Sequence, residues 1–116
     1  MARTAMAVVQ ASRTGTSLAP VAVDNVNGNS FANNGNTLLS LTNQGVTDLA
    51  ATIHAQSYVD GDASNGLKVP DRMIDIPAGE TILCGPFSPD IYNDPSGNVW
   101  LDVSGPVLAI AVIVSD

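Results

Sequence analysis

The chain is a succession of short apolar segments that alternate with turns rich in asparagine, glycine and proline. Residues 49–56 carry apolar side chains at the odd positions and mostly polar side chains at the even positions. Residues 37–42 and 98–103 show the same period of two, which is typical of a strand with one face on a core. Trp100 falls on the outward face of its predicted strand.

Residues 107–114, which include Ile113, are instead apolar at every position. A strand of this kind is covered on both faces. We predict that the core covers one face and that a second body, such as a neighbouring subunit, covers the other. The segment is far shorter than the roughly 20 residues that cross a bilayer, so no membrane segment is predicted.

Turn sequences recur roughly every eight to twelve residues, a spacing typical of sandwiches and barrels. The segments between them are too β-branched for a long helix, so at most one short helical turn is expected. We predict an all-β chain that forms a single β-sandwich, jelly-roll or immunoglobulin-like, with about seven or eight strands. The expected strands lie near residues 21–26, 30–32, 37–42, 49–56, 72–76, 80–84, 98–103 and 107–114.

Residues 1–20 differ from the rest because they are mostly small and polar and end at Pro20. They predict an extended N-terminal arm with little material for a core, followed by a sandwich domain over residues 21–116. Such an arm can add as a strand to a partner or to a neighbouring copy.

The charge of the chain is unevenly distributed. Four Lys and Arg residues face eleven Asp and Glu residues, which gives a formal net charge of −7. Arg3 and Arg13 lie in the first 23 residues, which contain no acidic residue, so a basic arm precedes an acidic body. An acidic body argues against a nucleic-acid partner. The single cysteine, Cys84, excludes an internal disulfide, and we expect a product made in the cytoplasm.

Catalytic chemistry has little support in the residues. His54 is the only imidazole, and no nucleophile motif accompanies it, so we interpret it as a surface residue and predict no enzyme. Cys84 has no basic neighbour in the sequence to lower its pKa, so a structural thiol is expected.

An acidic loop is the one candidate for a cation. Residues 60–66 followed by Asp71 approach a calcium-loop pattern, but the glycine falls one place late and Asp71 stands where a glutamate is expected. We interpret it as a solvated loop and predict neither a metal nor a cofactor.

Five residues are candidates for interaction with a partner: Arg3, Arg13, Trp100, Tyr92 and Ile113. Two interpretations of Trp100 stay open, because a tryptophan on an outer face either covers its own sheet or anchors a second subunit. Tyr92 lies near Phe87, for which packing under a loop is the simpler interpretation.

An ordered set of motifs resembles a known family. The set resembles the small β-sandwich virion proteins encoded near the major capsid gene of tailed bacteriophages, particularly those of actinobacteria. The resemblance covers roughly residues 30–114, and this chain carries the additional residues 62–65. The motifs are Asn36-Thr37-Leu38-Leu39, Thr42-Asn43, the Gly-Leu-x-Val-Pro-Asp-Arg element at 66–72, Pro77-Ala78-Gly79-Glu80, Gly85-Pro86-Phe87 and Tyr92.

The resemblance implies a capsid decoration or minor capsid protein without catalytic residues. Such a protein binds the major capsid protein on the outside of the phage head, stabilises the shell, and forms a homo-oligomer, with a trimer favoured. It belongs to the capsid surface of the virion. Two alternatives remain: a tail or neck component of the virion, and a carbohydrate-binding β-sandwich module, since sandwiches with aromatic and Asn-rich loops bind glycans.

Overall fold

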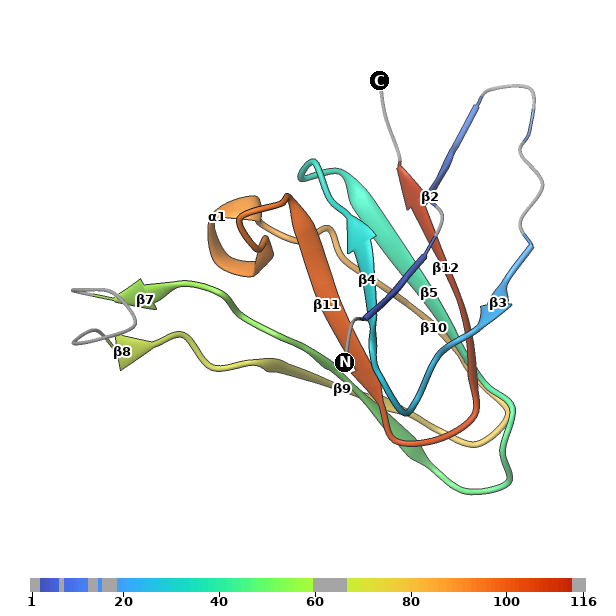
Figure 1. Cartoon of the computed structure of the whole chain (residues 1–116). Helices are drawn as coiled ribbons and strands as arrows, with labels where there is room; N and C mark the ends of the chain where they lie inside the picture. The colour runs from blue at the N-terminus through green and yellow to red at the C-terminus, as the bar shows by residue number, and fades with distance from the viewer. Residues whose placement is uncertain (1–2, 7, 13–14, 16–18, 60–66, 114–116) are drawn as a thin grey trace.

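The computed structural model describes residues 3–6, 8–12, 15, 19–59 and 67–113. Two packed sheets form a β-sandwich, which confirms the predicted all-β class (Figure 1). Sheet A contains, in spatial order, β1 (Thr4–Ala5), β4 (Asn29–Ala32), β11 (Asn98–Val103), β6 (Leu49–Ile53) and β9 (Arg72–Ile76). Sheet B contains β10 (Thr81–Cys84), β5 (Thr37–Asn43), β12 (Val107–Ile113) and β2 (Val8–Gln10), with β3 (Val21–Ala22) also paired to β12.

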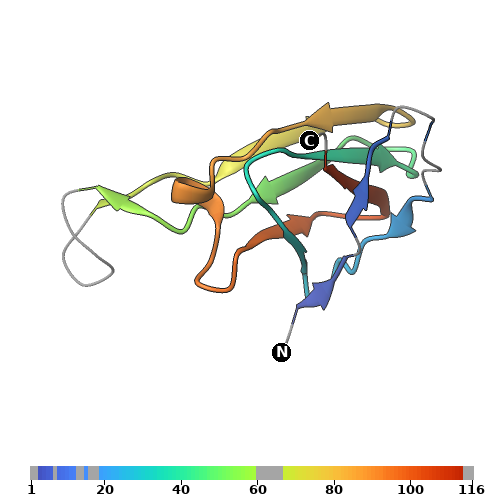
Figure 2. The ribbon, with the colours of Figure 1, turned by 90° about the horizontal axis from the view of Figure 1, so that it is seen from above.

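Two small elements lie outside these sheets. The strands β7 (Tyr58–Val59) and β8 (Leu67–Lys68) form a hairpin that projects from the sandwich, on the side opposite the blue N-terminal strands (Figures 1 and 2). The helix α1 (Pro89–Tyr92) is a single turn, consistent with the one short helical turn expected. No helix in the described ranges has the length and apolarity that crossing a membrane requires.

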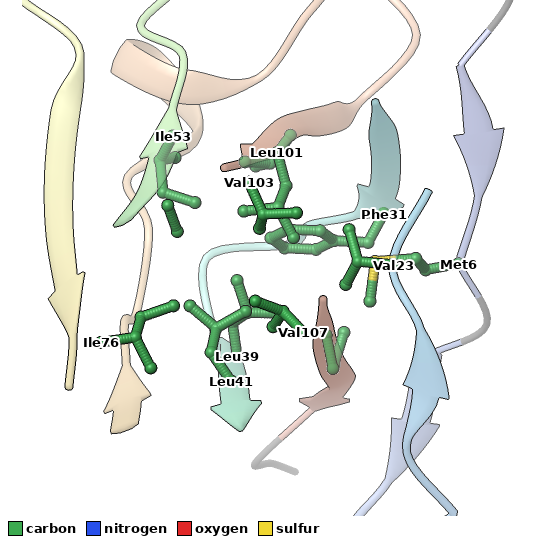
Figure 3. Close-up of a cluster of buried hydrophobic side chains, with 14 of the residues drawn as sticks. Met6, Val23, Phe31, Leu39, Leu41, Ile53, Ile76, Leu101, Val103 and Val107 are labelled. Atoms are coloured by element: carbon green, nitrogen blue, oxygen red, sulfur yellow. The ribbon is translucent and has the colours of Figure 1, made fainter. Parts of the chain in front are cut away.

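The core lies between the inner faces of the two sheets. The alternation in the sequence sets these faces: Leu39 and Leu41 of β5 are fully buried, as are Val99 and Leu101 of β11. Figure 3 shows side chains from both sheets meeting in this core, with Ile76 toward one end and Met6 toward the other. Burial of these aliphatic side chains is the main stabilising contribution to the fold.

The N-terminal segment contributes more to the sandwich than its composition suggests. β1 pairs in parallel with β4, and β2 pairs in parallel with β12, so the segment joins both sheets. Met6, between these two strands, is only 8% exposed and belongs to the core. Our expectation that residues 1–20 supply little core material is therefore wrong at Met6. The described parts of the segment add as strands to the chain's own sheets.

Two strands end earlier than the sequence predicts. The strand expected over residues 21–26 stops at Ala22, because the Asp24 carboxylate accepts the backbone N–H groups of Val26 and Asn27, both at 3.0 Å, and turns the chain. The strand expected over residues 49–56 stops at Ile53. The following N–H group, from His54, still donates to Trp100 O at 3.1 Å, but that of Ala55 donates to the Asp71 carboxylate at 2.9 Å.

The short strands β1, β2, β7 and β8 were not predicted, because two or three residues are too few for a period of two to be visible.

Candidate functional site

The outer face of sheet A carries a charged cluster, the Arg3 cluster, defined by Arg3, His54, Asp71, Trp100 and Asp102. Arg3 Nη1 donates to Asp102 Oδ1 at 2.8 Å and Arg3 Nη2 donates to Asp102 Oδ2 at 3.3 Å. The guanidinium carbon lies 4.7 Å from the centre of the Trp100 ring. This arrangement combines a two-point ion pair with a cation–π contact and ties the N-terminal strand β1 to β11.

His54 is held between two carboxylates in the same cluster. Its Nε2 lies 2.5 Å from Asp102 Oδ2, and its Nδ1 lies 3.1 Å from Asp71 Oδ2. A neutral imidazole carries one N–H, so only the imidazolium can donate to both carboxylates. The expectation of a histidine that merely fills a surface position is therefore incomplete: His54 is half-buried and fully engaged.

The carboxylates of this face have lowered pKa values. For Asp102, partial burial acts to raise the pKa, but hydrogen bonds and charge from Arg3 and His54 outweigh burial and lower it. For Asp94, burial likewise acts upward, while hydrogen bonds from the Asn98 backbone and the Trp100 indole, at 2.8 Å for the latter, lower the pKa. Both groups are therefore ionised at neutral pH.

A glycine makes room for the Arg3 cluster. Gly28 has a φ of +82°, and a Cβ added there would collide with Arg3 Nη1 and Asp102 Oδ1. The position thus requires glycine for its backbone conformation and for the space that the ion pair occupies.

Sheet B presents a different outer surface, which we call the sheet B outer face. On β5, β10 and β12 the residues that alternate with the core positions are aliphatic or carry hydroxyl groups, and none is charged. Leu83 is 65% exposed, whereas Ile110 is only 5% exposed although it lies outside the core cluster. The members of the face are Leu38, Ser40, Thr42, Thr81, Leu83, Leu108, Ile110 and Val112.

A small cavity opens where the edges of the two sheets face each other. We call it the edge pocket; its volume is about 170 Å³. Sheet A contributes Arg72 and Ile74 from β9, and sheet B contributes Cys84 from β10. Gly85, Pro86, Phe87 and Tyr92 complete the lining.

The structure brings two of the five predicted interaction residues together. Arg3 and Trp100 meet in the Arg3 cluster, where the guanidinium lies over the Trp100 ring. Tyr92 packs edge-on against Phe87, with ring centres 5.9 Å apart, and lines the edge pocket. Ile113 lies at the end of β12 opposite the buried Thr37, in the register of the inner face. Arg13 lies outside the described residues.

Sequence reasoning missed Arg72 and Asp102 as functional candidates. Asp102 alternates with buried residues, a signal that it faces outward, but nothing in the sequence connects it to Arg3, 99 positions away. Arg72 sits in the turn motif at 66–72, where its neighbours suggested only a chain reversal.

Cys84 is a structural thiol, as expected. Burial raises its pKa to about 11, and its Sγ donates to Leu39 O at 3.4 Å. Phe87 is 5% exposed and part of the core, which confirms its predicted packing role.

The acidic loop at residues 60–66 lies outside the described residues. Asp71, at its far end, is engaged by His54 and by the Ala55 amide. Over the described ranges, no group of three or more His, Cys, Asp or Glu side chains is arranged to hold a metal ion.

Comparison of the chain with protein-family models, with curated proteins and with solved structures finds no match.

Proposed function

We propose that this chain is a structural virion protein that decorates a phage head by binding the major capsid protein on the outside of the shell. The observation that carries the proposal is the sheet B outer face. On a chain with eleven acidic residues, this face contains no charged side chain and has five aliphatic ones. Apolar surfaces of this kind mark sites of protein association.

The two faces of the sandwich differ in a way that favours one-sided docking. The outer face of sheet A carries the Arg3 cluster and exposed polar residues, which remain solvated without a partner. On the outer face of sheet B the exposed apolar surface lies at Leu83, and its removal from water contributes about 25 cal/mol per Å². Docking through sheet B leaves the acidic, charged side of the molecule toward solvent.

A binding role without catalysis agrees with the contacts of His54, the only histidine in the sequence. A general base needs a ring nitrogen that is free to accept a proton from its substrate. Both ring nitrogens of His54 are engaged by carboxylates, so the residue is placed to hold the cluster together.

Glycan binding, by comparison, has less support. Sugar-binding sandwiches use an open aromatic ring as a platform for a sugar. The Trp100 ring is covered by the Arg3 guanidinium, and its indole N–H is bound by Asp94. A tail or neck position in the same virion would use the same docking face, and a density map of the particle separates it from a head position.

The test compares two substitutions with matched exposure on opposite sheets. Leu83, in the sheet B outer face, is 65% exposed, and Met73, on β9 in sheet A, is 61% exposed. Leu83→Glu should weaken co-sedimentation with heads of the phage that encodes the chain about tenfold or more, because it buries a charge in the contact. Met73→Glu should leave sedimentation unchanged. Equal effects of the two substitutions, or absence of the chain from purified virions, would overturn the proposal.

A further inference from the structure

The edge pocket combines several apolar side chains with a cation that has no partner among the described residues. Ile74, Cys84, Phe87 and Tyr92 supply aliphatic, thiol and aromatic surface, and Arg72 lies at the same cavity. None of these residues belongs to the Arg3 cluster or to the sheet B outer face.

Arg72 differs from the other described arginine in its pairing. Arg3 is engaged by Asp102, whereas the Arg72 guanidinium forms no ion pair or hydrogen bond with any described residue. An exposed guanidinium without a partner among the described residues is a site that attracts a carboxylate from another molecule.

The size of the pocket limits what fits. At about 170 Å³ it is smaller than the roughly 300 to 1,000 Å³ of a typical small-molecule site. It is close to the ~150 Å³ of an engineered apolar cavity in another protein that binds benzene. The pocket therefore has room for one ring or one branched aliphatic side chain.

The surroundings of the pocket favour a protein segment as the source of that side chain. β10 pairs with β5 on one side only, and β9 pairs with β6 on one side only, so within the described residues both strands that flank the pocket are sheet edges. An edge strand offers backbone N–H and C=O groups to an added strand. Because alternate residues of β10 face the pocket and the sheet B outer face, a segment added there would reach both surfaces.

From these observations we infer that the edge pocket binds an apolar side chain of an extended partner segment, while Arg72 binds a carboxylate of the same segment. The inference rests on the proposed function for the identity of the partner, the shell. It adds the chemistry of the contact: an aromatic or branched aliphatic residue next to an acidic one.

The experiment uses the isolated chain and three small probes that differ by one group each. N-acetylphenylalanine carries a ring and a carboxylate, N-acetylphenylalaninamide lacks the charge, and N-acetylalanine lacks the ring. Each is titrated at millimolar concentration into isotope-labelled protein at pH 7, and amide shifts are followed by NMR. We expect saturable shifts at Cys84, Phe87 and Tyr92 with N-acetylphenylalanine and no saturation with N-acetylalanine.

Variants assign the two contacts separately. Arg72→Gln should weaken N-acetylphenylalanine about threefold, as for an exposed ion pair, and should leave the amide probe unchanged, while Arg72→Lys should retain most of the affinity. Ile74→Phe should fill the pocket and abolish saturation, with a dispersed spectrum as the check that the variant folds. Met73→Gln, on the opposite face of β9, is the control and should behave as the unmodified chain.

Two results would overturn the inference: no saturable shift in the unmodified chain, or equal binding of the charged and uncharged ring probes. Either result leaves docking through the sheet B outer face untouched, since Leu83 is tested on particles and the pocket is tested on the free chain. If the chain proves not to bind a phage head, the titration still tests whether the edge pocket binds the probes.

Discussion

Arg3 and Asp102 form a two-point ion pair across 99 positions of the chain, with N–O distances of 2.8 and 3.3 Å. The pair fastens the first described strand to the middle of sheet A. It does so on the outer face, where Trp100 lies beneath the guanidinium. Closure of the sandwich at this end thus depends on a polar contact as well as on the burial of Met6.

Gly28 provides a test of the space that this pair needs. Gly28→Ala places a methyl group against Arg3 and Asp102 and forces alanine to adopt a φ of +82°. Gly97→Ala is the matched control, because Gly97 has a φ of +85° and nothing within 4 Å of an added Cβ. We expect Gly97→Ala to cost about 1–2 kcal/mol of unfolding free energy from backbone strain alone. Gly28→Ala should cost about 1 kcal/mol more, measured by urea unfolding. Equal losses would show that the ion pair moves aside freely.

The lowered pKa of Asp24 should make the stability of the fold sensitive to acid. Hydrogen bonds from the Asn27 backbone, the Thr4 hydroxyl and the Val26 backbone lower the pKa of Asp24 from 3.8 to about 2. Between these values the unfolded chain binds more protons than the folded chain, so protonation favours unfolding. The contribution is complete above pH 3.8 and is lost as the pH falls toward 2.

Asp24→Asn should therefore reduce the loss of stability between pH 4 and pH 2, seen as a smaller shift of the urea midpoint. Asp90→Asn, on the exposed first turn of α1, is the control. An unchanged pH dependence in Asp24→Asn would contradict the assignment.

Cys84 should react slowly with thiol reagents in the folded chain. With a pKa of about 11 instead of 9.0, its thiolate fraction at pH 8 falls on the order of a hundredfold. Iodoacetamide should label it correspondingly more slowly in buffer than in concentrated urea, as followed by mass spectrometry. Equal rates in the two solvents would contradict the raised pKa of the half-buried thiol.

Loss of the buried Asn43 side-chain amide should lower the unfolding free energy substantially. Its Nδ2 donates to Ile76 O at 2.8 Å and to Thr47 O at 2.9 Å, and its Oδ1 accepts the Gly45 N–H at 2.7 Å. Asn43→Ala should lower the unfolding free energy by about 2–3 kcal/mol, because a buried carbonyl loses its donor.

Asn34→Ala is the comparison for this prediction. Asn34 is exposed and accepts only the Asn36 N–H, at 2.9 Å, in a similar turn. Its loss should cost about 0.5 kcal/mol. Thermal or urea unfolding of the two variants measures the difference, and similar costs would mean that the Asn43 hydrogen bonds contribute little.

The inner and outer faces of the two layers follow from the local pattern of apolar and polar residues. The side-chain period of a strand is local, so alternation along residues 37–42 and 98–103 assigned inner and outer faces, and the buried Leu39, Leu41, Val99 and Leu101 follow it. Strands long enough to display that period, such as β9 and β11, were placed with the correct bounds.

The contacts between faces and edges, by contrast, depend on the folded arrangement of the strands. The Arg3 cluster joins Arg3, just before β1, to β11 and to the segments that follow β6 and precede β9. The edge pocket joins β9, β10 and α1. Contacts between such distant positions depend on how the sheets are ordered and stacked, and a local pattern of apolar and polar residues carries no information about that order. For the same reason the uncharged side of β12 was visible in the sequence, whereas its continuation across β5 and β10 was not.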